Sequence, residues 1–388
     1  MVVAGVVAEY NPFHLGHAWH LAQTRAALGP EGAVVCVMSG HWVQRGDCAI
    51  ADKWARAALA LAGGADLVLE LPTLWAMASA EPFARGAVGL LAATGVVEFL
   101  SFGSEGGDLS QLREAAAALD SPDYPDRLRA ALGRGLSYPA ARQEAAGCPC
   151  LSAPNNNLGV EYLRALSALG SSITPMTVPR RGAGHDSPEA AEGFASATYL
   201  RGLLREGRGP EAAPLLPGGA LEALGEPACL TWVERGILAR LRSMGEADWA
   251  SLPDSGAAEG LPARLARAAN QAVSLEEFYT LAKTRRYTHA RLRRLALGAF
   301  LGLRSDSRPA APLYVRVLGL NRRGRAILRE MKGSCSLPVV TKPAQARELE
   351  APARRLFAEE ARYTDLYGLC FSTPRPGGRE WVTSPVTL

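Results

Sequence analysis

Asn11-Pro12-Phe13-His14-Leu15-Gly16-His17 follows directly on an apolar run, residues 2–8, near the start of the chain. Such a run, bounded by turn residues, is typical of a buried strand, whereas residues 15–28 repeat apolar side chains at helical spacing. The sequence therefore predicts a strand, a turn and a helix, with His14 and His17 where the helix begins.

The alternation of short apolar runs and longer amphipathic runs continues through roughly the first two hundred residues. It predicts an α/β fold, a Rossmann-like doubly wound parallel sheet covered by helices on both faces. Further strands are expected over residues 33–38, 65–71, 98–102 and 172–178. Further helices are expected over residues 52–61, 81–93, 158–169 and 196–205, with a helical excursion over 107–145.

Glycine and proline are concentrated after residue 206, which is typical of a linker between domains. Beyond it the pattern predicts helices over residues 230–241, 261–272 and 275–303, and weaker strands over 313–318 and 337–340. We therefore expect an α/β domain over residues 1–206, a linker over 207–228 and a mainly helical domain over 229–388.

The composition favours a folded protein of the cytosol. With 388 residues and 48% apolar side chains, the chain is long enough for two hydrophobic cores. Seven cysteines without framework spacing are typical of reduced thiols. The apolar N-terminus has no preceding basic region and is too short to span a membrane, so we interpret it as a strand. A net charge of +4 does not by itself indicate nucleic acid.

The turn after the first strand is the candidate phosphate site, because no Walker A loop or Gly-x-Gly-x-x-Gly turn stands there. His14 and His17 share one face of a helix start, where the free amides and the dipole favour a phosphate. Gly16 leaves room for a flat base, Pro12 fixes the entry of the chain, and His20 lies one turn further along. A chance cluster and a zinc site are the alternatives, although no ligands at metal spacing accompany the pair.

Seven segments carry a family resemblance. They are Glu9 to His20, Met38-Ser39-Gly40-His41-Trp42-Val43-Gln44-Arg45-Gly46, Gly64-Ala65-Asp66-Leu67-Val68-Leu69-Glu70-Leu71-Pro72, Phe102-Gly103-Ser104-Glu105, Pro154-Asn155-Asn156, Arg180 to Asp186 and Arg286-Tyr287-Thr288-His289-Ala290-Arg291. The first resembles the His-x-Gly-His signature of the nucleotidyltransferase superfamily. Together, from residue 1 to about residue 300, they resemble the bacterial tRNA(Met) cytidine acetate ligases.

The resemblance implies an ATP-dependent ligase that forms acetyl-adenylate from acetate and ATP. It implies transfer of the acetyl group to N4 of the wobble cytidine of elongator tRNA(Met), giving N4-acetylcytidine, with AMP and pyrophosphate as the other products. His14 and His17 would be the catalytic residues, stabilising negative charge that develops on the phosphates. Mg²⁺ would arrive with the ATP phosphates, without a metal site made by the protein. From the residues alone, only ATP bound for attack at phosphorus is supported.

Other segments add candidate ATP contacts, each with an ordinary alternative. Ser196, Thr198 and Arg201 resemble the Ser/Thr-x-x-Arg phosphate motif, or else form a plain helix cap with a surface arginine. Gly103 and Asn156 would approach the nucleotide, or else form a turn and a cap. The ATP-binding residues expected are Val7, Ala8, Glu9, Tyr10, Asn11, Pro12, Phe13, His14, Leu15, Gly16, His17, His20, Gly103, Asn156, Arg180, Arg181, Ser196, Thr198 and Arg201.

Two departures from the family pattern affect this set. Residues 182–186 lack the aromatic side chain that usually precedes the histidine, and Asn157 stands where an aliphatic residue is usual. Both Arg180 and Arg181 are therefore candidate ATP contacts, since either can pair with a phosphate through two hydrogen bonds.

Residues 283–294 concentrate basic side chains around one tyrosine, a pattern that suits an RNA backbone. The expected tRNA contacts are Lys283, Arg285, Arg286, Arg291 and Arg294. A merely solvated helix face is the alternative.

Three functions remain open at this point. The chain is a tRNA acetate ligase, an adenylyltransferase for a small phosphorylated metabolite, or a non-catalytic RNA-binding module that kept a nucleotide pocket. A basic surface in the second half favours the first over the second, and the intact His14 and His17 argue against the third.

Overall fold

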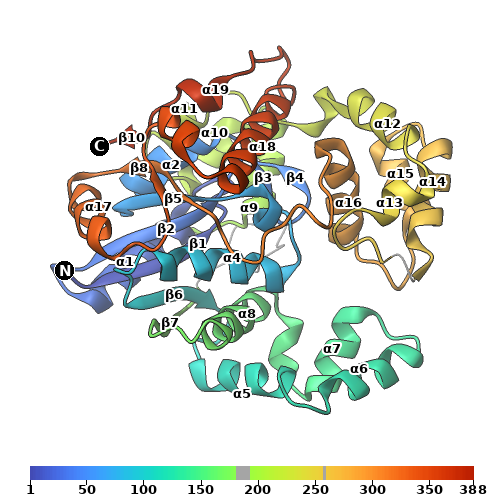
Figure 1. Ribbon diagram of the computed structural model, residues 1–388, viewed down its shortest axis with the longest axis horizontal. Helices are drawn as coiled ribbons and strands as arrows, with labels where there is room; N and C mark the ends of the chain where they lie inside the picture. Colours follow the sequence, from blue (N-terminus) through green and yellow to red (C-terminus); the bar gives the residue numbers. More distant parts are fainter. Residues whose placement is uncertain (181–192, 257–258) are drawn as a thin grey trace.

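The structure, a computed structural model, describes residues 1–180, 193–256 and 259–388, and its centre is a mostly parallel sheet (Figure 1). The strand order is β10-β8-β5-β2-β1-β6-β7, with β9 beside β8. The strands are β1 (Val3–Ala8), β2 (Ala33–Ser39), β5 (Leu67–Leu71), β6 (Phe99–Ser104), β7 (Thr174–Pro179), β8 (Val315–Leu320), β9 (Val339–Val340) and β10 (Val386–Thr387). The predicted Rossmann-like core is confirmed, with β8 antiparallel to β5 as an addition.

Side chains on alternate positions of the central strands enter two separate cores, because successive residues of a strand point to opposite faces. Val35 and Val37 pack on one face and Val34 and Cys36 on the other, all fully buried. The first face is covered by α4 (Ala80–Ala93) and α8 (Pro154–Ala168), and the second by α1 (Leu15–Leu28), α2 (Lys53–Ala62) and α9 (Ala197–Arg205). Helices on both faces explain why the strands are nearly continuously apolar.

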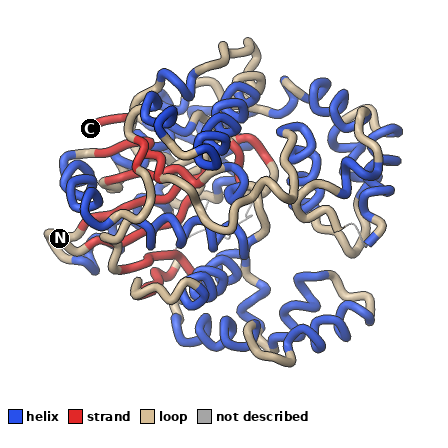
Figure 2. Tube along the Cα trace, in the orientation of Figure 1, coloured by secondary structure: helices blue, strands red, loops and turns tan. Residues whose placement is uncertain are grey.

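The sheet and the helices that cover it form the α/β body. Two groups of helices extend from the same side of this body, and Figure 2 shows that neither group contains strands of the sheet. The excursion holds α5 (Leu109–Leu119), α6 (Tyr124–Gly133) and α7 (Tyr138–Ala146), as predicted. The second group, which we call the helical arm, holds α12 (Glu234–Arg242), α13 (Glu246–Ala250), α14 (Leu261–Gln271), α15 (Leu275–Ala282) and α16 (His289–Leu301).

The single helix expected over residues 275–303 is wrong, because the chain leaves the helix between α15 and α16. Lys283 is extended, with φ −66° and ψ 136°, and Thr288 starts the next helix by accepting a hydrogen bond from the backbone N–H of Arg291. A threonine hydroxyl that caps a new helix competes with continuation of the old one. Half of the basic segment is therefore a loop.

Residues 207–228, expected as a linker, instead hold two short helices packed on the body. These are α10 (Gly209–Ala212) and α11 (Ala220–Leu224). Ala212 of α10, Ala220 and Leu224 of α11, and Leu216 between the two helices are buried in the same core as α2 and α9. Composition alone did not distinguish the two, because glycine and proline are common at the ends of short helices as well as in linkers.

The C-terminal residues after the helical arm return to the sheet. They contribute β8, β9 and β10, together with α17 (Arg322–Ser334), α18 (Ala351–Tyr367) and α19 (Arg379–Val382). Two short strands that the sequence analysis did not predict, β3 (Trp42–Val43) and β4 (Asp47–Cys48), form a hairpin, which we call the 42–48 hairpin. The C-terminal residues contact this hairpin as well. The short α3 (Thr73–Ala76) lies beside this hairpin. The strands expected over residues 313–318 and 337–340 are thus found as β8 and β9, and the C-terminal part is mainly helical, as predicted.

Two further properties concern the described part of the chain. Its seven cysteines are all free thiols. None of its helices is both long and apolar enough to cross a membrane.

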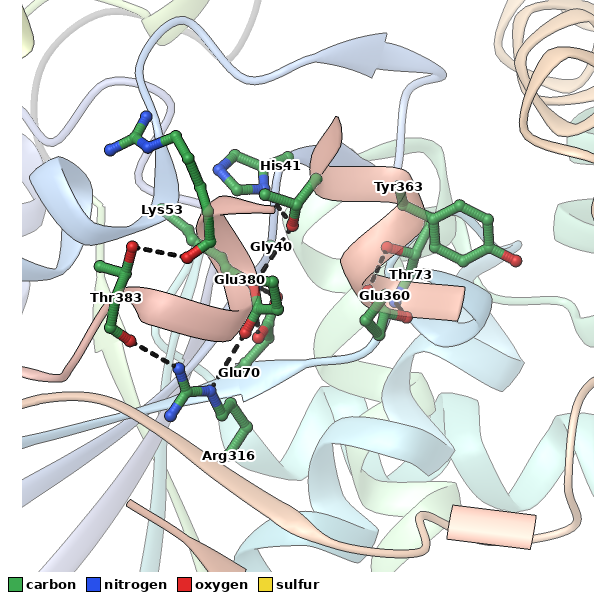
Figure 3. Close-up of polar contacts among 12 residues, drawn as sticks. Gly40, His41, Lys53, Glu70, Thr73, Arg316, Glu360, Tyr363, Glu380 and Thr383 are labelled. Atoms are coloured by element: carbon green, nitrogen blue, oxygen red, sulfur yellow. Dashed lines mark hydrogen bonds and ion pairs between the residues drawn. The ribbon is translucent and has the colours of Figure 1, made fainter. Parts of the chain in front are cut away.

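A buried network of charged side chains joins the C-terminal part to α2 and β5 (Figure 3). Lys53 Nζ lies 2.6 Å from Glu70 and 2.5 Å from Glu380, and Arg316 lies 3.2 Å from the other oxygen of Glu380. All four side chains are at most 4% exposed. Two cations thus balance two carboxylates, as buried charges require.

A third carboxyl group, Glu360 on α18, lies beside this network and accepts hydrogen bonds from the backbone N–H and the hydroxyl of Thr73, at 2.6 and 2.7 Å. Burial, with the negative charge of Glu70, raises the pKa of Glu360 to about 8. The folded carboxyl therefore keeps its proton through a pH range in which the unfolded one has lost it. It follows that the free energy of unfolding falls as the pH rises from the ordinary pKa of glutamate towards that value.

We expect Glu360→Gln to remove this dependence, because a neutral amide preserves both contacts with Thr73 and has no proton to lose. At about pH 9 the variant should be more stable than the parent by at least about 1 kcal/mol, and at about pH 5 the two should be nearly equal. Urea denaturation at the two pH values measures the difference. Parallel pH profiles of parent and variant would contradict the proton on Glu360.

Candidate active site

A cavity of about 300 Å³, comparable with small-molecule sites, lies at the carboxyl ends of β1, β6 and β7, beside the start of α1. In an open α/β sheet this edge is where ligands bind. Its wall also includes the 42–48 hairpin, the start of α9 and Arg293 of α16. The predicted residues that line it are Val7, Ala8, Glu9, Tyr10, Asn11, His14, Gly16, His17, His20, Gly103, Arg180, Thr198 and Arg201.

The two histidines at the start of α1 stack on each other, with ring centroids 3.7 Å apart and planes 25° from parallel. The backbone N–H of Gly16 donates to His14 Nδ1 at 3.1 Å, and the backbone N–H of His14 donates to His17 Nδ1 at 3.3 Å. Because both Nδ1 atoms accept, each neutral ring carries its proton on Nε2. The pair is therefore built to present ring N–H groups at a helix N-terminus, where an anion is favoured.

The structure gives a different reason for glycine at position 16 from the one expected, which was room for a flat base. A Cβ atom at this position would lie 2.9 Å from His14 Cε1, closer than carbon atoms approach. The glycine therefore makes room for the ring of His14 over the helix start, and the expected space for a base is not needed to explain it.

The Asn-Pro-Phe lead-in to α1 anchors the turn. Asn11 Oδ1 accepts from the backbone N–H of Ile50 at 2.7 Å, and its carbonyl accepts from Arg201 Nη1 at 2.7 Å. Phe13 is fully buried, and its ring packs against Gly63, where a Cβ would lie 2.2 Å away. These contacts hold the histidine pair in place from behind.

Among the residues that the structure describes, four arginines line the cavity: Arg45, Arg180, Arg201 and Arg293. Arg180 donates to Asn155 Oδ1 and Arg201 to Thr198 Oγ1, both at 3.1 Å. Burial lowers the pKa of Arg180 and of Arg201 from that of a free guanidinium, because their charge is partly removed from water. A bound anion would restore favourable electrostatics to these charges, so the geometry suits a polyphosphate.

His20 lines the cavity as expected but is engaged elsewhere. Its Nε2 lies 3.0 Å from Ser101 Oγ, which in turn lies 2.6 Å from Thr24 Oγ1. Burial, assisted by the nearby charge of Arg180, lowers the pKa of His20 to about 4. The ring is therefore neutral near pH 7, and its Nε2 serves the serine rather than a phosphate.

Other predicted residues do not line the cavity: Pro12, Phe13, Leu15, Asn156 and Ser196. Ser196 accepts from the backbone N–H of Tyr199 as the N-cap of α9, which was the ordinary alternative. Asn156 accepts from the backbone N–H of Glu105 and donates to the carbonyl of Cys150, so it joins two loops. Its neighbour Asn155 lines the cavity instead. Arg181 falls outside the described residues.

Several lining residues were missed from the sequence, chiefly Trp19, Gln44, Arg45, Asp47, Phe83, Asn155, Tyr162 and Arg293. Gln44 and Arg45 lie in one of the segments that carry the family resemblance, which was the available signal. Gln44 also holds the base of the site, because its backbone N–H donates to Glu9 Oε1 at 2.7 Å. Burial raises the pKa of that glutamate.

The basic segment 283–294 divides into two groups. Arg285 and Arg286 are exposed in the loop before α16. Arg291 donates to the carbonyl of Asp254 at 2.9 Å and to Glu259 at 3.2 Å, and Arg294 donates to the carbonyl of Gln44 at 3.3 Å. Lys283 donates to the carbonyl of Thr284 at 2.6 Å. Arg291 thus stabilises the arm and Arg294 joins it to the 42–48 hairpin, and contact of either side chain with RNA stays a prediction.

Among residues 1–180, 193–256 and 259–388, no group of three or more His, Cys, Asp or Glu side chains is arranged to hold a metal ion. The carboxylates on the cavity wall, Glu9 and Asp47, stand among the four arginines.

Known proteins resemble the chain over its whole length. Residues 1–379 match the family model of the HIGH nucleotidyl transferases. The tRNA(Met) cytidine acetate ligase of Acetivibrio thermocellus is 35% identical, with 100% of each chain covered. That of Caldanaerobacter subterraneus subsp. tengcongensis is 37% identical, with 96% of each covered.

Solved structures agree with these sequence matches. The apo crystal structure of Thermotoga maritima TmcAL matches with a TM-score of 0.94 and 34% identity, over 100% of both chains. The crystal structure of the same protein bound with alpha-thio ATP matches with a TM-score of 0.92 and 33% identity, again over 100% of both chains.

Proposed function

The chain belongs to the HIGH nucleotidyl transferase family, and we propose that it works there as an ATP-dependent tRNA(Met) cytidine acetate ligase. It joins acetate to ATP as acetyl-adenylate and then acetylates N4 of the wobble cytidine of elongator tRNA(Met). The observation that carries this proposal is the stacked pair His14 and His17 beside four arginines, in a chain whose full-length relatives bear that name. These relatives favour it over a small-metabolite adenylyltransferase.

In the first step an acetate oxygen attacks the α-phosphorus of ATP, and pyrophosphate leaves with the electrons of the broken bond. The protein's part is positioning and compensation of negative charge. The ring N–H groups of His14 and His17 donate to phosphate oxygens, and Arg180 and Arg201 add positive charge around the leaving group. Mg²⁺ comes with the ATP phosphates, since the carboxylates Glu9 and Asp47 of the cavity wall stand among arginines and histidines.

In the second step the N4 nitrogen of the cytidine attacks the acetyl carbonyl carbon. AMP leaves with the electrons of the carbon–oxygen bond, and the nitrogen loses a proton. The tRNA must therefore reach the mouth of the cavity while its backbone rests on a basic surface. Arg285 and Arg286 are exposed on the loop before α16, the helix whose Arg293 lines the cavity. A tRNA substrate and seven free cysteines both suit work in the cytoplasm.

Incubation of the protein with ATP, isotopically labelled acetate and tRNA tests the function. Mass spectrometry of the digested tRNA should find the label in N4-acetylcytidine, and omission of ATP should abolish it. An unlabelled tRNA, with the label instead in a small adenylylated metabolite, would contradict the proposal.

Replacing both Arg285 and Arg286 with alanine should weaken tRNA binding and reduce the slope of its salt dependence by roughly two, because each arginine releases about one counterion. Filter binding at several salt concentrations measures this. By contrast, Arg291→Ala should mainly lower the melting temperature, since Arg291 bonds Asp254 and Glu259. An unchanged salt slope in the double variant would move the RNA surface elsewhere.

A further inference from the structure

Arg293 belongs to two surfaces at once. It is an exposed residue of α16, one helical turn after the loop with Arg285 and Arg286, and it also lines the cavity at the start of α1. The sequence pointed to its neighbours Arg291, which donates to Asp254 within the arm, and Arg294, which donates to the carbonyl of Gln44 in the 42–48 hairpin. Arg293 therefore marks the place where the basic segment meets the nucleotide cavity.

The position of Arg293 is fixed by the 42–48 hairpin. Gly46, at φ +72°, touches the helix so closely that a Cβ atom there would lie 2.6 Å from the carbonyl carbon of Arg293 and 2.5 Å from the backbone nitrogen of Arg294. Arg294 also donates to the carbonyl of Gln44, whose own N–H donates to Glu9 in the cavity wall. A short chain of contacts thus holds α16 beside the cavity. A side chain that must reach a reacting group needs such a fixed position.

The guanidinium of Arg293 is available for a ligand. Within residues 1–180, 193–256 and 259–388 it makes no hydrogen bond or ion pair, and its contact is with the ring of Tyr279, 5.8 Å from the centroid. Arg180 and Arg201, in contrast, already donate to Asn155 and Thr198 within the cavity. A planar guanidinium with its donors unused fits a phosphate that arrives from outside.

We propose, resting on the function proposed above, that Arg293 binds the RNA phosphate next to the reacting cytidine and so positions that base for acetyl transfer. Arg293 then acts in the second step, after acetyl-adenylate has formed. The donors for the nucleotide's own phosphates, His14, His17, Arg180 and Arg201, come from the α/β body, whereas Arg293 comes from the arm that carries the exposed arginines of the basic segment.

The test separates the two steps in Arg293→Ala. Formation of acetyl-adenylate is measured without tRNA, as acetate-dependent exchange of labelled pyrophosphate into ATP. Acetylation of tRNA is measured as kcat and KM. Loss of one charge-assisted contact should lower the kcat of acetylation about 10- to 100-fold. Exchange should fall much less, and Arg293→Lys, which keeps the charge, should lie between parent and alanine variant.

Two matched variants serve as controls. Arg285→Ala removes an exposed arginine of the same basic segment that does not line the cavity, so it should raise KM for tRNA and leave kcat nearly intact. Arg325→Ala, an exposed arginine on α17, removes the same charge away from the arm and should match the parent.

Exchange that falls as far as acetylation would overturn the inference, because Arg293 would then serve ATP. A change in the KM for tRNA with an unchanged kcat would also overturn the inference, since any contact with the RNA backbone away from the reacting cytidine would have that effect. If the parent protein itself does not acetylate tRNA, the proposed function fails instead, and the result is distinguishable because it appears before any substitution is made.

Discussion

His17→Ala should reduce acetate-dependent pyrophosphate exchange by about 10²- to 10³-fold, the usual cost of removing one preorganised donor from developing negative charge. The stacked rings of His14 and His17 are 3.7 Å apart, and the bond from the His14 N–H to Nδ1 leaves the proton of His17 on Nε2. Alanine removes that donor without filling the cavity. Binding of tRNA should be nearly unchanged, because the basic segment lies on the helical arm.

The same substitution removes one capping bond of α1, so the melting temperature of the variant must be measured beside its activity. We expect a loss of roughly 1 kcal/mol, too small to unfold the protein. His289→Ala provides the matched control in the exchange assay, because His289 is an exposed histidine outside the cavity. Exchange at the parent rate in a folded His17→Ala would exclude His17 from the mechanism.

Lys53→Met should lower the free energy of unfolding by about 3–5 kcal/mol, because it leaves buried carboxylates without their cation. Burial opposes the charge of Lys53, but Glu380 and Glu70 outweigh it, so the pKa of Lys53 is raised. The network also joins the C-terminal part to α2 and β5 of the α/β body (Figure 3). Urea denaturation measures the loss, and exchange activity should fall with it.

Charge balance distinguishes this explanation from simple loss of packing. In the double variant Lys53→Met, Glu70→Gln, one cation and one carboxylate are both removed, and Arg316 still pairs with Glu380 at 3.2 Å. The double variant should therefore recover part of the stability lost in the single one. A double variant no more stable than Lys53→Met would mean that packing, not charge, sets the cost.

The parts of the fold that the sequence predicted are those set by local pattern. The first strand, the turn and α1 follow from apolar periodicity and from a glycine between two histidines, and they were found within one residue of the expected bounds. The parallel strands β2 and β5 were equally clear, because they are buried along their whole length and nearly all apolar.

What the sequence did not predict depends on distant residues. The 42–48 hairpin has strands of two residues each, too short for any periodicity, and contacts in α18 hold it, such as the bond from Trp42 Nε1 to the carbonyl of Tyr363. The return of β8 to the sheet joins residues about 250 positions apart. Likewise, nothing local distinguishes Arg293 at the cavity from Arg294, whose partner is a carbonyl of the hairpin.

The transfer of oxygen from labelled acetate tests most directly the claim that ATP is attacked at its α-phosphorus in this cavity. With acetate labelled by ¹⁸O in both oxygens, ATP and tRNA, the account predicts one labelled oxygen in the AMP that is released, because that oxygen bridged the acetyl group and the α-phosphorus. Label found in orthophosphate, with unlabelled AMP, would instead mean that acetate attacks the terminal phosphorus, and the account would be wrong.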